Sequence, residues 1–315
     1  GSSAFGANNR WGYFPSVSAA WGIDGEDFMK NQNIFSELKL RVSYGQTGNS
    51  LGFNPLVSLL RYGNVGTFLV NGVTLSAIGV VQNPNPDLRW EKTAMSNIGL
   101  DFGILKSKVT GTLDLYNKRT TDLIWTYDVD PSVYLFRQLT ANAGEMSNKG
   151  VELTLNYTPV KTKNFTWNTS VNLAHNRNLL VSLKGEGLQA DSLLMAAPNG
   201  GGQTGSTVQI LLSGQPVGQF FTFQHAGRNE AGVSQFTSSK GGTTLVPLNK
   251  NDYFLAGNAQ PKLLLGWNNN LTYKQFDLNF FFRSVLGNKI MNTVRADFNR
   301  PQEAGSYNVL VETAD

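Results

Sequence analysis

The chain has 315 residues, enough for one large domain or two ordinary ones, so length alone excludes no fold class. Composition is more informative, because aromatic residues make up 11% and charged residues only 15%, against roughly 25% charged residues in an ordinary soluble domain. The formal net charge of +4 comes from Lys and Arg scattered along the chain, so no basic run predicts a nucleic-acid partner. Cysteine is absent, which excludes disulfide frameworks, zinc–thiolate sites and thiol nucleophiles.

Two long stretches without charge, residues 62–86 and 192–227, have the length of transmembrane helices. The first is rich in Gly, Asn and β-branched residues, which favour extended structure. The second contains Pro198, Pro216 and three consecutive glycines, which interrupt helices. Both stretches are therefore interpreted as uncharged strands or loops.

Strict alternation of apolar and polar residues recurs along the chain and predicts strands with two unlike faces. The pattern is clearest where Leu263, Leu265 and Trp267 alternate with smaller or polar residues. In chain order the predicted long strands are residues 13–22, 37–46, 88–102, 107–119, 149–157, 165–175, 261–273 and 276–287.

The two faces of these strands predict two different surroundings. The apolar face is expected to contact lipid and includes Leu38, Leu40, Leu153, Leu155, Trp267, Phe280 and Phe282. The polar face, rich in Asn, Thr and Ser, suits a water-filled lumen. The candidate lumen-facing residues are Lys39, Arg41, Glu152, Asn156, Asn168, Asn172, Asn268, Asn270, Asp277 and Arg283.

A soluble sandwich would show the same alternation, with its apolar faces in a shared core. Two features favour a membrane barrel instead. The predicted strands have about 10–15 residues, at or above the ~9–11 needed to cross a bilayer obliquely. Aromatic residues occur near strand ends, where an interfacial girdle would place them: Trp90, Tyr116, Tyr157, Phe165, Tyr273 and Phe276. The predicted fold class is all-β, an antiparallel transmembrane β-barrel of which about eight long strands are present.

The connections alternate between short and long, as in barrels with tight periplasmic turns and large outer loops. Short links are predicted at residues 103–106, 158–164 and 273–275, and long ones at 46–87, 120–148 and 176–260. Because the long and short links must emerge on opposite sides, segment 176–260 is expected to be a long extracellular loop region.

Several phrases of the sequence carry a resemblance when they are read in order. They are residues 38–49 (LKLRVSYGQTGN), 86–93 (PDLRWEKT), 114–123 (DLYNKRTTDL), 142–153 (NAGEMSNKGVEL) and 214–218 (GQPVG). The series resembles the SusC/RagA family of TonB-dependent outer-membrane transporters, typical of Bacteroidetes, over nearly all of residues 1–315.

The resemblance implies a multi-pass protein of the outer membrane of a Gram-negative bacterium, whose barrel has about 22 strands. It also implies a plug domain energised by the TonB complex, and a SusD-like surface lipoprotein as partner. The plug, the N-terminal barrel strands and the TonB-contacting part are expected to be absent from this chain.

Motifs for nucleophilic, phosphate-binding or metal-dependent chemistry are missing, so no enzyme activity, cofactor or metal is predicted. His175 and His225 lie in unrelated contexts, and Asp128 and Asp130 are read as solvated loop carboxylates. The Gly-rich segment 199–205 is read as a flexible outer loop. Five aromatics are candidate contacts for substrate or partner, although packing of the loop on itself is the simpler explanation: Phe220, Phe221, Phe223, Tyr253 and Phe254.

The sequence therefore predicts import of a bulky solute, a glycan or peptide, across the outer membrane. Two alternatives from other classes stay open at this point. One is a secreted β-rich adhesin or glycan-binding module, whose apolar faces would meet each other and not lipid. The other is a passive porin, which would lack a plug.

Overall fold

A computed structural model describes residues 1–50, 54–185, 190–196, 207–247, 249–299, 305–306 and 308–311. The chain divides into two units, one formed by Gly1–Asp191 with Leu263–Val285 and the other by Ser192–Lys262 with Leu286–Asp315. The predicted Gly-rich loop at 199–205 lies outside the described residues.

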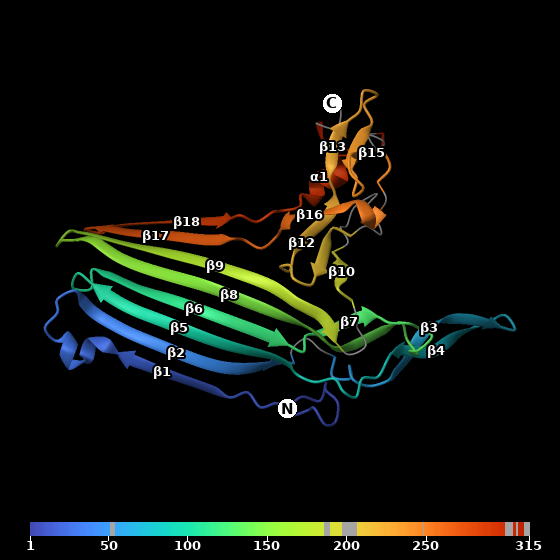
Figure 1. The fold of residues 1–315 in the computed structure, drawn as a ribbon, viewed down its shortest axis with the longest axis horizontal. Helices are drawn as coiled ribbons and strands as arrows, with labels where there is room; N and C mark the ends of the chain where they lie inside the picture. Colours follow the sequence, from blue (N-terminus) through green and yellow to red (C-terminus); the bar gives the residue numbers. More distant parts are fainter. Residues whose placement is uncertain are drawn as a thin grey trace. The chain divides into compact units, whose positions relative to one another are not determined.

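The first unit is built on one large antiparallel sheet, called the main sheet below (Figure 1). Eight of its strands follow one another in the order β1-β2-β5-β6-β8-β9-β17-β18, and β7 adds to β8. Their bounds are β1 Ser16–Gly22, β2 Phe35–Asn49, β5 Glu91–Ile104, β6 Val109–Thr121, β7 Ile124–Asp128, β8 Gln138–Lys161, β9 Phe165–Gly185, β17 Leu263–Tyr273 and β18 Phe276–Leu286. The eight strands predicted from alternation are these eight, in the predicted order.

The short links between these strands gather at one end of the main sheet, and β3, β4 and β7 extend beyond the other (Figure 1). The link from β1 to β2 holds two 3-10 turns, η1 Ile23–Gly25 and η2 Asp27–Met29. At the opposite end, β3 Arg61–Val70 and β4 Val73–Gln82 form a separate hairpin. The alternation of short and long links is thus present as predicted.

Two predicted loop boundaries are wrong. β8 begins at Gln138 and has 24 residues, and β9 continues to Gly185 and has 21. Residues 176–185, predicted to begin one loop, instead pair with residues 143–150 of β8, as in the pairing of Ser147 with Leu179. Residues 138–142, predicted to lie in the preceding loop, pair with β7. The two strands are about twice as long as a bilayer crossing requires. Apolar and polar residues therefore alternate only in the part of each strand that would cross the membrane, while the backbone pairing continues beyond it.

The register places like residues side by side across the main sheet. One row, in which each residue pairs with the next, runs Trp21, Leu40, Leu100, Leu113, Leu153, Leu173 and Leu265. Directly opposed residues point to the same side of a sheet, so this row defines the apolar face. The next row on the other side, the polar face, runs Lys39, Asp101, Thr112, Thr154, Asn172 and Gly266.

The apolar face is not covered by a second sheet within the described part of the chain. Trp267 is 40% exposed and Phe282 55% exposed, although these large side chains stack on each other with ring centroids 5.6 Å apart. A soluble monomer rarely exposes so large a contiguous apolar surface. The arrangement of the seven predicted lipid-facing residues on one uncovered face therefore favours a barrel wall over half of a sandwich.

Two small clusters contain buried side chains of the first unit, and one of them lies on β7 and β8 of the main sheet. Ala4, Phe5, Val57 and Leu88 form the other, outside the strands of this sheet. Beside it, segment 83–89 follows the start of β8 although Pro84 and Pro86 have no N–H to donate. Side-chain amides replace the missing bonds: Asn83 donates to the carbonyls of Phe136 and Gln138, Asn85 to Thr140, and Asn142 to Arg89 and Asp122.

The second unit holds two smaller antiparallel sheets, so the predicted loop region 176–260 is largely structured. One sheet has the order β10-β11-β12-β16 and the other β13-β14-β15. Their bounds are β10 Ser192–Met195, β11 Gln209–Leu212, β12 Gln219–Phe223, β13 His225–Arg228, β14 Ser234–Thr237, β15 Thr243–Thr244 and β16 Tyr253–Asn258, with η3 Asn249–Asp252 and the helix α1 Thr293–Phe298. Among the described residues, no helix has the length and hydropathy needed to cross a membrane.

Candidate functional site

The polar face of the main sheet brings together the ten residues predicted to line a lumen. Arg41 lies in the row of Gly99, Asp114 and Glu152, while Asn156 pairs with Ser170, which in turn pairs with Asn268. Asn168 pairs with Asn270, and Asn279 donates a hydrogen bond to Asn270. These contacts carry the polar face across to β18, where Asp277 accepts from Thr272 at 2.8 Å.

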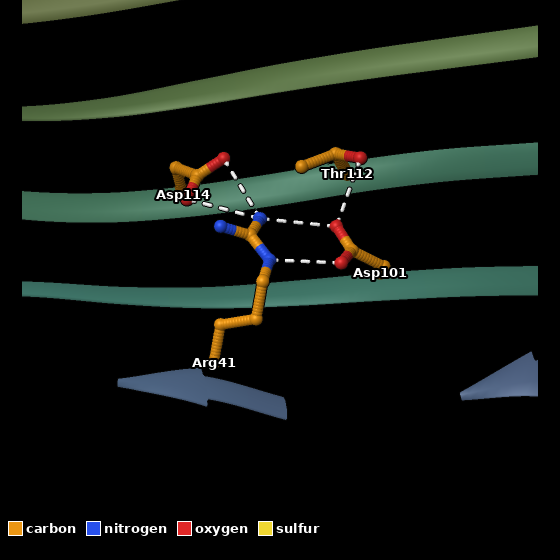
Figure 2. A network of polar contacts seen from close by, with 4 residues as sticks. All are labelled: Arg41, Asp101, Thr112 and Asp114. Atoms are coloured by element: carbon orange, nitrogen blue, oxygen red, sulfur yellow. Dashed lines mark hydrogen bonds and ion pairs between the residues drawn. The ribbon is translucent and has the colours of Figure 1, made fainter. Parts of the chain in front are cut away.

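The strongest electrostatic feature of this face is a network around Arg41, shown in Figure 2. The guanidinium donates to both carboxylate oxygens of Asp101, at 2.8 and 3.0 Å, and to those of Asp114 at 3.2 and 3.3 Å. Thr112 donates to Asp101 at 3.1 Å. The network ties β2, β5 and β6 together through charge-assisted bonds, which are stronger than neutral ones.

Gly99 makes the Arg41 network possible. An added Cβ at this position would lie 2.6 Å from Arg41 Cζ and 2.6 Å from Asp114 Oδ1, far inside van der Waals contact. The side chain of Arg41 therefore crosses β5 at the one position of its row that has no side chain. Alternation placed Arg41 on the polar face, but sequence reasoning did not single out Asp101, although it alternates with Leu100 and Phe102.

The prediction that Tyr116 belongs to an interfacial aromatic girdle is wrong. Its position near a strand end suggested an interfacial aromatic, but it pairs with Asn97 and Gly150 and so belongs to the polar face. A Cβ on Gly150 would lie 2.4 Å from the Tyr116 ring, which shows that the ring lies over this glycine. The Tyr116 hydroxyl donates to Asn176 at 3.3 Å.

The five candidate contact aromatics lie in the second unit, and three of them pack together. Tyr253 meets Phe223 edge-on with ring centroids 4.5 Å apart, and Phe221 at 5.3 Å. Phe223 also contacts Phe236, at 5.8 Å. All five are partly buried, and Phe220 lines a hollow of about 540 Å³ with Lys289, Ile290 and other residues of the same unit.

The remaining polar candidates have local partners. Asp128 accepts from Gln138 at 3.2 Å. Asp130 accepts from the backbone N–H of Ser132 at 2.8 Å, and this hydrogen bond holds the pKa of Asp130 below its usual range. His225 lies edge-on to Phe236. No group of three or more His, Asp and Glu within the described ranges could hold a metal ion.

Comparison with known proteins decides the family. The model of the family described as TonB dependent receptor-like, beta-barrel matches residues 1–204. The chain belongs to this family. It is therefore part of an outer-membrane β-barrel protein of a Gram-negative bacterium, and the relatives reported next fit the Bacteroidetes.

TonB-dependent receptor P3 of Formosa agariphila is 32% identical over 310 residues, which are 93% of this chain and 30% of the relative. TonB-dependent receptor SusC of Bacteroides thetaiotaomicron is also 32% identical, over 92% of this chain and 29% of the relative. The structure of the RagAB peptide transporter has the same fold, with a TM-score of 0.78 at 24% identity over 93% of this chain and 31% of that one. The chain thus spans about a third of the length of the relatives that it matches.

Proposed function

We propose that this chain forms part of the wall of a TonB-dependent importer that carries a glycan or a peptide across the outer membrane. The observation that carries the proposal is the unlike pair of faces on the main sheet: an uncovered apolar row from Trp21 to Leu265, and a polar face tied together around Arg41. A wall between lipid and a wet passage requires this division. SusC and the RagAB peptide transporter, to which the chain is similar, support uptake as the activity.

A second part of the proposal concerns the partner, a SusD-like surface lipoprotein. The β3–β4 hairpin exposes large apolar side chains, among them Tyr62 at 65%, Leu69 at 70% and Ile78 at 68%. A two-stranded hairpin is barely stable alone in water, and exposed apolar patches of this kind mark protein interfaces. The hairpin, at the end of the sheet away from the short links, is the proposed contact. We propose no catalytic role for the chain.

Uptake is tested in cells. A strain in which the gene of the complete receptor is deleted should lose growth on the imported glycan or peptide and regain it on complementation, and it should also lose growth when TonB is inactivated. Growth that survives loss of TonB with the receptor in place would point to a passive porin. Binding at the surface without uptake would point to an adhesin.

The proposed external position of segment 176–260 has its own test. Replacing Phe220, Phe221 and Tyr253 together by Ala should weaken uptake or partner binding several-fold while surface expression stays normal, if the aromatics contact substrate or partner. Since Phe221 and Tyr253 pack on each other, the single variant Phe220→Ala separates contact from packing. Protease access from the periplasm, not from outside, would overturn the topology.

A further inference from the structure

A hollow of about 410 Å³ lies on the polar face across β1, β2, β5 and β6. Gly45 is at its centre, in the row that joins Ser16, Gly45, Met95 and Lys118. An added Cβ at Gly45 would come within 3.3 Å of Ser16 Cβ, so the missing side chain opens the space. The hollow is thus built into the wall, on the side assigned above to the passage.

Lys118 is the charged residue of this hollow, and it forms no ion pair with an acidic residue in the described part of the chain. The ion pairs found within the described residues do not include it, and the carboxylate nearest along its own strand face, Asp114, is bonded to Arg41. Its ammonium lies over the Tyr116 ring, 5.1 Å from the centroid. An ammonium has three N–H donors, so a lysine that contacts an aromatic ring still has donors with which it can bind an anion.

The other lining groups are hydroxyls. Ser16, Ser18 and Ser43 line the hollow, and their hydroxyls have no hydrogen-bond partner in the part of the chain that the structure describes. Each hydroxyl can both donate and accept, as sugar hydroxyls do. The backbone groups of β2 and β5 are used in pairing with their neighbours, so little main chain is left to recognise a peptide backbone.

We propose that this hollow binds an acidic oligosaccharide, with Lys118 holding its anionic group, a carboxylate or sulfate, and the serine hydroxyls bonding to its sugar hydroxyls. The inference rests on the proposed import function and names the class of solute for it. It also places the binding site for this oligosaccharide on the barrel wall, between β1 and β6.

Binding is measured by isothermal titration calorimetry on the complete receptor in detergent, with tri-galacturonate, the neutral maltotriose and tri-glutamate as probes. Tri-galacturonate should bind more tightly than the other two, and its affinity should fall as salt is raised. Lys118→Gln should weaken it about tenfold, the usual contribution of a hydrogen bond to a charged group. Lys118→Arg should retain most of the affinity, and Gly45→Val should weaken binding by filling the hollow without changing charge.

Lys149→Gln is the matched control. Lys149 pairs with Asn117 and lies on the apolar side of the same sheet. The substitution therefore removes one exposed positive charge but leaves the hollow intact. Equal loss of affinity in Lys118→Gln and Lys149→Gln would overturn the proposal, and so would maltotriose or tri-glutamate binding as tightly as tri-galacturonate. The proposed import function is judged separately, by growth. If Lys118→Gln leaves both uptake and binding unchanged, the proposed binding site in the hollow is rejected and the import function still stands.

Discussion

Replacement of Asn142 by Ala tests whether side-chain amides hold segment 83–89 in place of a strand ladder. Asn142 is 3% exposed and makes three bonds to main chain. Its Oδ1 accepts from Arg89 N at 2.9 Å, and its Nδ2 donates to the carbonyls of Arg89 at 2.8 Å and Asp122 at 2.9 Å. Ala keeps none of them.

The expected cost follows from these bonds. A hydrogen bond contributes roughly 0.5–1.5 kcal/mol net, and loss of three should cost about 2–4 kcal/mol of local stability. The ion pair of Arg89 with Asp122, at 2.6 Å, remains, but the Arg89 side chain is 43% exposed, so the pair offsets little of this. The loss should appear as local opening, because the ladder between β5 and β6 does not include these contacts.

Hydrogen exchange followed by mass spectrometry on the complete receptor measures this opening. Peptides covering residues 83–90 and β7 should exchange at least about 30-fold faster in Asn142→Ala, the factor that corresponds to 2 kcal/mol. Peptides of β5 and β6 should be unchanged. Asn156→Ala is the control, since Asn156 is exposed on the same strand, β8. Less than threefold acceleration at 83–90, or equal acceleration throughout the sheet, would refute the reasoning.

Two further outcomes test the main sheet. Gly99→Val should force the Arg41 network open and cost about 1–2 kcal/mol in urea unfolding of the refolded receptor, because the pairs it breaks are partly exposed. Ala at the control position Asn97, which lies on the same strand outside this network, should cost less than half as much. Leu153→Arg should cost roughly 2–4 kcal/mol and Asn156→Arg under about 1 kcal/mol if the apolar face meets lipid. Equal costs at Leu153 and Asn156 would indicate that both faces of the main sheet pack against a protein core, as in a soluble protein.

Alternation predicted the strands well because it is local: a strand needs only its own residues to show which side is apolar. Leu153 and Leu155 alternate with Thr154 and Asn156 in the sequence, and pairing with neighbours did not change that. The ends of β8 and β9 were not predictable in this way. Beyond His175 the sequence reads Asn, Arg, Asn, which carries no alternation, yet the backbone pairing with β8 continues to Gly185.

Contacts that depend on register were beyond the sequence for the same reason. The partner of Arg41 across β5 follows only once Gly99 is known to lie beside it. The amides of Asn83 and Asn85 reach main-chain atoms more than fifty residues away. Pro84 and Pro86, which alternate with these two asparagines, were a signal in the sequence, because a backbone that lacks N–H donors must find donors in side chains.

Charged residues on the polar face have two different roles: paired charges stabilise the wall, and unpaired charges can bind a solute. Arg41 is shared by Asp101 and Asp114, and Lys39 lies directly opposite Asp101, so these two cations lie beside these two carboxylates. Charges balanced in this way give little attraction to an ion in the passage. Paired charges alone would not discriminate between solutes. An unpaired charge such as Lys118 can do so. Recognition should therefore be concentrated where the wall leaves a charge unpaired, and variants of the balanced set should change stability more than selectivity.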